Sequence, residues 1–283
     1  MMELFKRVID LRSRLDTIVA SGKTVGFVPT MGALHAGHIS LVKKCSAEND
    51  ICVVSIFVNP TQFNDPKDLK NYPRDLDKDL NLLQSTNCHF VFAPNEMEIY
   101  PKPDQRIFQI GSMETVMEGK QRPGHFQGVA KVVSKLFDII KPNKAYFGEK
   151  DYQQIAIIRR MLEITNQPVE IVACPILREP DGLALSSRNL LLTPECRKQT
   201  PIIAKTLMEA RNKATNMSVK DLTQWVITQI DATPLLKVEY FEVANAYTLM
   251  PIDTWQQGEP TVGCIAVQAG NVRLIDNVKF DSK

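Results

Sequence analysis

The chain of 283 residues has no long apolar run, no large excess of charge of one sign and no C-x-x-C pair. No segment approaches the roughly 18 consecutive apolar residues of a membrane span, and the charged, amphipathic start has no signal-peptide core. We therefore expect a soluble, cytoplasmic protein with no membrane partner. The net charge of +2 reflects nearly balanced Lys+Arg and Asp+Glu, which argues against a dedicated nucleic-acid binder.

The cysteines also lack a pattern, since the six are scattered and several lie in apolar runs such as "ICVVSIFV". Buried, reduced thiols are therefore expected, rather than a disulfide framework. What the sequence does have is 44% hydrophobic residues, enough to fill a substantial core. The protein is expected to be globular, with one large domain or two ordinary ones.

Apolar periodicity predicts alternating helices and strands. Residues 3–20 carry apolar side chains at helical spacing and predict a helix. Strand-like runs at "TVGFV", "ICVVSIFV", "HFVFAP", "KAYFG" and "VEIVACP" alternate with helical patterns near 39–49, 75–85, 129–140 and 151–164. This alternation predicts an α/β fold with a doubly wound, Rossmann-like parallel sheet.

The pattern changes after the turn-rich segment "REPDG". Helical segments at about 194–215 and 218–230 lead to strands near 236–244, 261–268 and 272–276. We expect a first domain of residues 1–177 and a smaller C-terminal α+β domain of residues 178–283.

In open α/β sheets, ligands bind beyond the carboxyl ends of the strands, so the loops there are the candidate site. The first loop, in "VPTMGALHAGH", carries His35 and His38 together with Gly32 and Gly37. A zinc protease helix would need histidines four residues apart and a glutamate between them. Backbone amides at a glycine-rich helix start, with imidazoles as further donors, favour phosphate binding instead. A local capping role and a metal role remain alternatives.

Two further loops carry amides and a lysine. In "FVNPTQFN", the amides of Asn59 and Gln62 suit a hydroxyl or a carboxylate, although they are also compatible with a plain turn. In "FGEKDYQQ", Lys150 can hold a phosphate and Gln154 can face the same cleft one helical turn along. The alternative is an exposed lysine beside Asp151 as a helix cap.

The fourth loop, "DGLALSSRN", offers two hydroxyls and the guanidinium of Arg188 to a polyphosphate, or it is a linking turn. An acid-rich segment, "NDPKDLKNYPRDLDKD", contains two carboxylates, Asp77 and Asp79, that could meet a metal. A solvated helix start is the alternative for that segment.

An H-x-G-H loop after the first strand of such a sheet, with a Ser-Ser-Arg loop far downstream, resembles the nucleotidyltransferase superfamily, which shares its fold with class I aminoacyl-tRNA synthetases. Within it, the chain most resembles the pantothenate synthetase (pantoate–β-alanine ligase) family. The similar segments, in order between Val28 and Asn277, are "PTMGALHAGH", "SIFVNPTQF", "YPRD", "RPGHFQGV", "FGEKDYQQ", "DGLALSSRN" and "RLIDN".

The resemblance implies an AMP-forming acid–amine ligase of coenzyme A precursor biosynthesis. Such an enzyme condenses (R)-pantoate with β-alanine to pantothenate, using ATP and Mg²⁺ and passing through a pantoyl-adenylate. A homodimer is also implied, with the second domain as a lid.

The resemblance assigns roles to residues of each loop. The implied ATP-binding residues are Met31, Gly32, Ala33, Leu34, His35, Ala36, Gly37, His38, Gly148, Glu149, Lys150, Asp151, Leu177, Leu185, Ser186, Ser187 and Arg188. The implied catalytic residues among them are His35, His38, Lys150 and Arg188. The implied residues for pantoate and β-alanine are Asn59, Gln62, Gln154 and Arg122. The implied Mg²⁺ ligand is Asp77 or Asp79.

Other functions stay open at this point. A nucleotidyltransferase that joins a nucleotide to a phosphate ester would not release AMP, and a non-catalytic sensor would bind ATP without turnover. A tRNA-charging enzyme would need an anticodon-binding extension and a basic surface, neither of which is evident. It is also open whether His38 transfers a proton or only stabilises charge.

Overall fold

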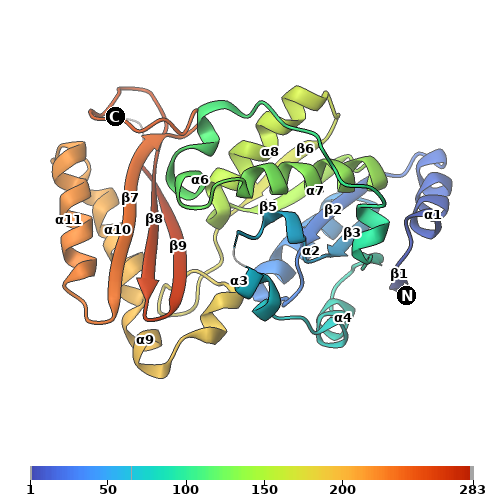
Figure 1. Cartoon of the computed structure of the whole chain (residues 1–283), viewed down its shortest axis with the longest axis horizontal. Helices are drawn as coiled ribbons and strands as arrows, with labels where there is room; N and C mark the ends of the chain where they lie inside the picture. The colour runs from blue at the N-terminus through green and yellow to red at the C-terminus, as the bar shows by residue number, and fades with distance from the viewer. Residues whose placement is uncertain (1, 65, 281–283) are drawn as a thin grey trace.

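The computed structural model describes residues 2–64 and 66–280. Its larger sheet has six parallel strands in the order β1-β4-β3-β2-β5-β6 (Figure 1). The chain winds outward from β2 in both directions, so the sheet is doubly wound and the predicted fold class is confirmed. These strands are β1 (Glu3–Phe5), β2 (Val25–Thr30), β3 (Ile51–Ile56), β4 (Phe90–Phe92), β5 (Lys144–Gly148) and β6 (Glu170–Cys174).

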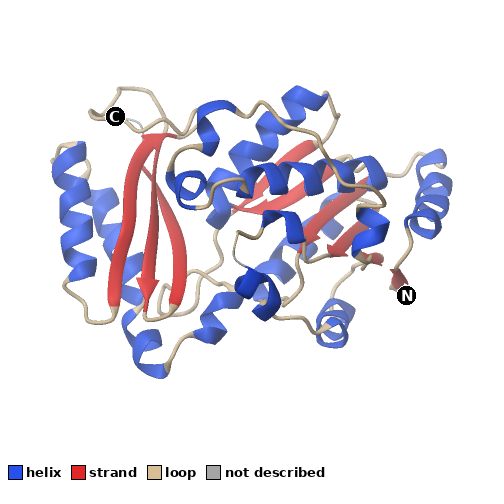
Figure 2. Ribbon diagram, viewed as in Figure 1, coloured by secondary structure: helices blue, strands red, loops and turns tan. Residues whose placement is uncertain are grey.

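Helices cover both faces of this sheet (Figure 2). On one face, α1, α7 and α8 pack around Phe27, Val53 and Phe92, and on the other, α2 and α4 pack around Val28 and Val54. Alternate residues of β2 and β3 thus point to two buried faces, which explains their near-continuous apolar sequences. The helices named are α1 (Val8–Ala20), α2 (Ala36–Glu48), α4 (Leu76–Gln84), α7 (His125–Ile140) and α8 (Tyr152–Thr165).

Short helical segments lie in the connections of this first part of the chain. They are α3 (Pro66–Asn71), α5 (Glu96–Ile99), α6 (Met117–Gln121), and the 3₁₀ turns η1 (Pro60–Gln62), η2 (Gly111–Glu114), η3 (Glu149–Asp151) and η4 (Ser187–Leu191), the last of which follows β6. Two of these turns, η1 and η3, follow β3 and β5 closely, at the carboxyl edge of the sheet.

The C-terminal part has an antiparallel sheet of β7 (Leu236–Asn245), β8 (Thr261–Ala269) and β9 (Val272–Phe280). Helices α10 (Pro201–Lys213) and α11 (Val219–Asp231) pack on one face of it and enclose a separate core, while the short α9 (Pro194–Gln199) precedes them. Figure 1 shows the strands between these outer helices and the first sheet. The predicted smaller α+β unit is present, and the boundary at residue 178 stays a prediction.

Two details of the helix prediction are wrong. Residues Glu3–Phe5 form an edge strand rather than the first turn of a helix, because their backbone pairs with β4. The ring of Phe5 also packs edge-on against that of Phe90, with the ring centroids 5.4 Å apart. The helix predicted over 194–215 is divided, because Pro201 has no N–H with which to continue α9 and instead begins α10.

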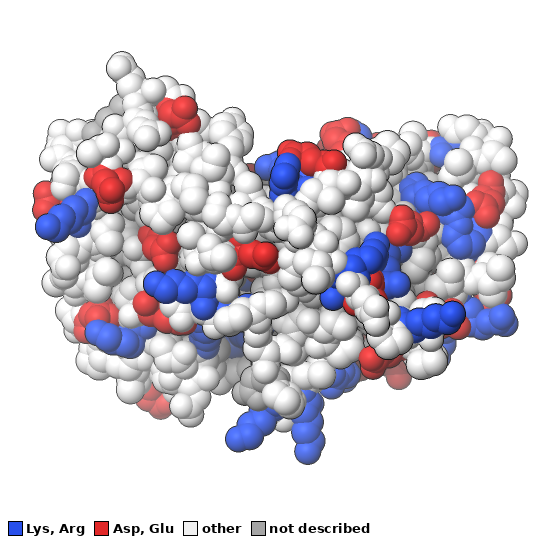
Figure 3. Space-filling model, turned by 45° about the horizontal axis from the view of Figure 1, so that its top comes forward, with Lys and Arg blue, Asp and Glu red and all other residues white. Residues whose placement is uncertain are grey.

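The six cysteines are all buried and none forms a disulfide, in agreement with the expectation from their spacing. Among the described residues, no helix is both long enough and apolar enough to cross a membrane. On the face drawn in Figure 3, charges of both signs are interspersed.

Candidate active site

The loops after β2, β3, β5 and β6 meet where the sheet changes winding direction, between β2 and β5. They surround a cavity of about 220 Å³. The predicted residues that line it are Met31, His35, Gly37, His38, Asn59, Gln62, Gly148, Lys150, Asp151, Gln154, Leu177, Leu185, Ser186, Ser187 and Arg188. The four loops therefore form one site, although they lie far apart in the chain.

A buried carboxylate shapes the loop that follows β2. Asp79, from α4, accepts hydrogen bonds from the backbone N–H groups of Ala33 and Leu34 at 3.0 and 2.7 Å. The loop turns through positive φ at Gly32 (79°) and Ala33 (50°). A Cβ at Gly32 would lie 2.9 Å from the Asp79 carboxylate, so a glycine is required there.

The two histidines are fixed against each other at the start of α2. The N–H of Gly37 donates to Nδ1 of His35 at 3.1 Å, and the N–H of His35 donates to Nδ1 of His38 at 3.3 Å. The ring centroids are 4.1 Å apart. Because both Nδ1 atoms accept, each neutral ring carries its proton on Nε2, which remains the available donor. A Cβ at Gly37 would lie 2.8 Å from the His35 ring, which explains the glycine of H-x-G-H.

The surroundings of both imidazoles favour the neutral form. Burial, followed by the nearby Lys150 charge, lowers the pKa of His35 to about 4. Burial, followed by His35 and Lys150, lowers the pKa of His38 to about 3. The site therefore presents uncharged donors beside a cationic lysine.

Asn59 and Gln62 form a connected pair at η1. The Asn59 side chain is 1% exposed and donates to Oε1 of Gln62 and to the carbonyl of Gly128, both at 3.2 Å. Its Oδ1 accepts from the hydroxyl of Tyr100 at 3.0 Å. The Gln62 amide group in turn lies 2.9 Å from the sulfur of Met31. Asn59 is thus committed to protein partners and holds Gln62 at the cavity.

The turn after β5 brings a cation and an amide to the same cavity. Lys150 on η3 lies 3.5 Å from Asp151, and its side chain is 19% exposed. Gln154, in the first turn of α8, lines the cavity, and its side chain makes no hydrogen bond within residues 2–64 and 66–280. Its neighbour Gln153 points elsewhere and bonds the backbone of Met113, Val116 and Glu118. Of these two glutamines, Gln154 is the one available to a ligand.

The loop after β6 closes the site with hydroxyls and a guanidinium. Ser186 accepts the N–H of Arg188 at 3.3 Å, which begins η4. The backbone N–H of Leu185 donates to the carbonyl of Leu177 at 3.0 Å, so two of the predicted ATP-binding positions are adjacent. This segment precedes the second sheet and connects the two parts of the molecule.

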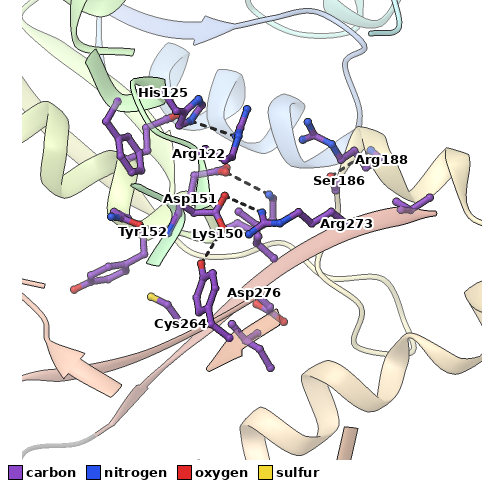
Figure 4. A pocket seen from close by; sticks show the side chains of 18 of the residues that line it. Arg122, His125, Lys150, Asp151, Tyr152, Ser186, Arg188, Cys264, Arg273 and Asp276 are labelled. Atoms are coloured by element: carbon purple, nitrogen blue, oxygen red, sulfur yellow. Dashed lines mark hydrogen bonds and ion pairs between the residues drawn. The ribbon is translucent and has the colours of Figure 1, made fainter. Parts of the chain in front are cut away.

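A second cavity, of about 290 Å³, adjoins the first and shares Lys150, Asp151, Gln154, Ser186 and Arg188 with it. In Figure 4, Arg122 and His125 lie on one side of Lys150, and Arg273 of the C-terminal sheet extends toward it. The predicted substrate residue Arg122 lines this cavity rather than the one that contains Gln62. The remaining predicted positions, Gly32, Ala33, Leu34, Ala36 and Glu149, line neither cavity and belong to the supporting backbone.

The two candidate metal ligands differ in position. Neither lines a cavity: Asp77 is exposed, and the buried Asp79 contacts the loop after β2. No group of three or more His, Cys, Asp or Glu side chains able to hold a metal occurs in the part of the chain described above. Mg²⁺ in nucleotide sites is commonly held by one or two carboxylates together with phosphates and water. Asp79 is 2% exposed and both of its oxygens accept N–H groups of the loop, so its carboxylate does not face the cavity in which phosphates would bind.

Two contributions were not predicted from the sequence. His125, within "RPGHF", bonds the carbonyl of Gln62 at 2.7 Å through Nδ1. Asn277, within "RLIDN", donates to the carbonyls of Glu149 and Lys150 at 2.8 and 3.1 Å. Both motifs are visible in the sequence, but only the fold shows which loops they contact.

A Rossmann-like sheet whose H-x-G-H loop, lysine turn and Ser-Ser-Arg loop share one cavity defines an ATP-using enzyme of the nucleotidyltransferase class. A family model described as pantoate-beta-alanine ligase matches residues 3–279. The chain belongs to the pantoate–β-alanine ligase family.

Individual relatives match over nearly the full length of both proteins. A pantothenate synthetase of Porphyromonas gingivalis is 54% identical over 280 residues, which are 99% of this chain and 100% of the relative. One from Aquifex aeolicus is 48% identical over 282 residues, 99% of each protein.

Solved structures agree with the sequence relatives. A pantothenate synthetase from Thermus thermophilus is similar with a TM-score of 0.90 and 42% identity, covering 98% of this chain and 99% of that one. A pantoate-beta-alanine ligase from Francisella tularensis, complexed with beta-gamma ATP and beta-alanine, has a TM-score of 0.79 and 36% identity, covering 98% and 97%.

Proposed function

We propose that this chain condenses (R)-pantoate with β-alanine to give pantothenate, AMP and pyrophosphate, through a pantoyl-adenylate formed in the shared cavity. The observation that carries the proposal is that side chains suited to bind phosphate and side chains suited to bind a carboxylate line one cavity. The H-x-G-H loop and Lys150 line this cavity, and the amides of Gln62 and Gln154 line the same space.

In the first step, a carboxylate oxygen of pantoate attacks the α-phosphorus of ATP. A new P–O bond forms, the bond between the α-phosphorus and its bridging oxygen to the β-phosphate breaks, and pyrophosphate leaves. Lys150, Arg188 and the hydroxyls of Ser186 and Ser187 stabilise the charge on the leaving group. The protein supplies alignment and fixed charge, as in other phosphoryl-type transfers.

His35 and His38 act as neutral hydrogen-bond donors to the phosphates through their Nε2–H groups. Burial and the Lys150 charge lower the pKa of both rings, which favours their neutral, hydrogen-bonding form. The departing pyrophosphate needs no proton near neutral pH. We therefore propose charge stabilisation, rather than general acid catalysis, for His38.

Gln62 and Gln154 hold pantoate, and Asn59 positions Gln62. This division follows from hydrogen bonding. The side-chain donor and acceptor groups of Asn59 bond other residues of the protein, whereas the side chain of Gln154 makes no hydrogen bond within the described segments. An amide can both donate to a carboxylate and accept from a hydroxyl, which are the two kinds of polar group in pantoate.

In the second step, the amine of β-alanine attacks the acyl carbon, the amide bond forms, AMP leaves and the nitrogen loses a proton. We infer that Arg122 serves β-alanine from the adjoining cavity, where it lies beside His125 at 3.4 Å. The C-terminal sheet borders that cavity and acts as a lid that keeps water from the acyl-adenylate.

We infer from the similarity to the family that Mg²⁺ accompanies ATP, where it would neutralise phosphate charge. Neither Asp77 nor Asp79 lines the two cavities, so neither is assigned as its ligand. The similarity to the family also supports a cytoplasmic homodimer, and we propose both the location and the assembly on that ground alone.

Oxygen-18 transfer tests the adenylate mechanism directly. Pantoate labelled with oxygen-18 in its carboxylate is incubated with Mg-ATP, β-alanine and the protein, and AMP is analysed by mass spectrometry. Attack on the α-phosphorus predicts that AMP carries a single labelled oxygen. AMP without label would contradict the proposed first step.

A further inference from the structure

We propose that Asn277, on β9 of the C-terminal sheet, is a positioning residue that fixes Lys150 for pyrophosphate departure. The inference rests on the proposed role of Lys150 in adenylation. It assigns to the second domain a function beyond covering the site, because one of its side chains holds the backbone that carries a catalytic cation.

The geometry starts from the side-chain amide of Asn277, which is 4% exposed. Its nitrogen donates to the carbonyl of Glu149 at 2.8 Å and to that of Lys150 at 3.1 Å. Both amide hydrogens are thereby used on two successive carbonyls of η3. A buried donor pair directed at one turn restrains the position of that turn.

The turn that carries Lys150, η3 (Glu149–Asp151), has few side-chain hydrogen bonds of its own. The N-cap position of η3 is Gly148, which has no side chain to cap it, and the side chain of Asp151 makes no capping hydrogen bond to α8. The Lys150 side chain has a weak contact with Asp151 at 3.5 Å. The contacts from β9 are therefore the main side-chain hydrogen bonds to the backbone of this turn.

A second residue of β9 supports the same turn. Residues two apart on a strand share a face, and Lys279 follows Asn277 at that spacing. Lys279 forms an ion pair with Glu149 and lies 6.0 Å from the ring centre of Tyr152, at the start of α8. Two side chains of one strand thus hold both ends of the segment that contains Lys150.

β9 is itself anchored beside this contact. Asp276 is 5% exposed and receives a bidentate pair from Arg178, at 2.6 and 2.9 Å. The backbone N–H of Asn277 donates to the same carboxylate at 2.8 Å. Arg178 follows β6, so the first sheet, the connection and β9 are linked immediately next to the lysine turn.

The consequence for catalysis concerns the position of one charge. Lys150 is close enough to His35 and His38 that its charge contributes to lowering the pKa of each. If the turn moved, the ammonium would leave the place where the pyrophosphate charge develops. Misplacement by about 1 Å can reduce a rate by about a hundredfold.

A double-mutant cycle tests this in the full-length protein. Single-turnover, pantoate-dependent pyrophosphate release is measured for wild type, Asn277→Asp, Lys150→Ala and the combination. Asn277→Asp keeps the shape and removes both donors but adds a buried carboxylate, so the cycle is repeated with Asn277→Ser, which adds no charge. We expect Asn277→Asp to reduce the rate of pyrophosphate release at least tenfold when Lys150 is present, and less than twofold when Lys150 is replaced. The KM for pantoate, measured separately by steady-state kinetics, should be unchanged.

A control uses the same sheet away from both cavities. Gln268→Ala, on β8, removes the hydrogen bond from the Gln268 amide to the carbonyl of Gly270, at 2.9 Å, and changes no contact of η3. The control should change the rate of pyrophosphate release by the same factor in the protein with Lys150 and in Lys150→Ala. The proposal would be overturned if Asn277→Asp also reduced the rate by equal factors in both proteins, or if that variant were fully active.

A binding measurement separates this inference from the proposed function. Asn277→Ser, a milder change that covers the case in which the aspartate variant does not fold, is combined with Lys150→Ala. Binding of a non-hydrolysable ATP analogue is measured by calorimetry. Asn277→Ser should weaken binding of the analogue only when Lys150 is present. If the two substitutions weaken binding additively, the positioning role is contradicted, whether or not an adenylate forms. If wild type releases no pantoate-dependent pyrophosphate, the proposed function fails instead.

Discussion

The carboxylate of Asp79 holds the loop of Leu34 through a backbone hydrogen bond of 2.7 Å, with a second bond of 3.0 Å to Ala33. The acid-rich segment behind the second loop therefore supports the H-x-G-H turn. An exposed acid two positions earlier, Asp77, makes no such contact with that loop. This pair gives a direct comparison.

Asp79→Asn should lower the free energy of unfolding by about 1–3 kcal/mol, because its amide nitrogen cannot accept an N–H. The KM for Mg-ATP should rise with it, since the phosphate loop loses its support. Thermal unfolding and steady-state kinetics measure the two effects. Asp77→Asn is the control, and a larger loss of activity in that variant would show that the wrong acid has been assigned.

Lys150→Ala should reduce the rate of pantoate-dependent pyrophosphate release by about a hundredfold or more, because a charge stabiliser of the leaving group is removed. Stability should change little. Lys144→Ala, on β5 a few residues earlier, removes a partly exposed lysine with weak contacts to Glu48 and Glu170 at 3.9 and 3.8 Å. Equal activities of the two variants would remove Lys150 from the mechanism.

Adjacent glutamines on α8 should respond in opposite ways. Gln154→Ala should raise the KM for pantoate about tenfold or more and leave the melting temperature unchanged, because its amide faces the cavity. Gln153→Ala should mainly destabilise the fold, because it leaves the N–H of Glu118 and the carbonyls of Met113 and Val116 without these side-chain partners. The assignment fails if the two phenotypes are exchanged.

Stability should depend on pH through His125. Burial, with a contribution from the Arg122 charge, lowers the pKa of His125 to about 4. Between that value and an unfolded pKa of about 6.5, the unfolded state binds a proton that the folded state does not. The free energy of unfolding should therefore rise as the pH is raised through this window and level off above it.

The slope should be smaller in His125→Gln by up to about 1.4 kcal/mol per pH unit, the value for one proton. Urea unfolding at several pH values spaced evenly across the window measures the slope. An identical slope in the variant would mean that His125 titrates normally in the folded protein.

Much of the fold was predictable, because buried parallel strands have continuous apolar sequences and helices have apolar residues at helical spacing. The first strand was not, since Glu3–Phe5 depends on pairing with β4, a partner far along the chain. The fold class was predicted from apolar periodicity and the family and enzyme type from motifs, and the comparisons confirm all three.

Individual roles were harder to predict, because a residue type does not tell which partners it meets. Asn59 and Gln154 both carry amides in motifs, yet one is saturated by protein partners and the other faces the cavity. Asn277 and His125 lie far in the chain from the turns that they contact. Their roles depend on the meeting of distant segments, which local sequence does not encode.

The most direct test of the central claim is AMP formation with each substrate omitted in turn. The purified protein is mixed with Mg-ATP and pantoate, β-alanine is then added, and AMP and pantothenate are quantified by chromatography. The proposed function predicts equal amounts of AMP and pantothenate, and catalytic turnover only when all three substrates are present. AMP formation that does not require pantoate, or no AMP at all, would contradict it.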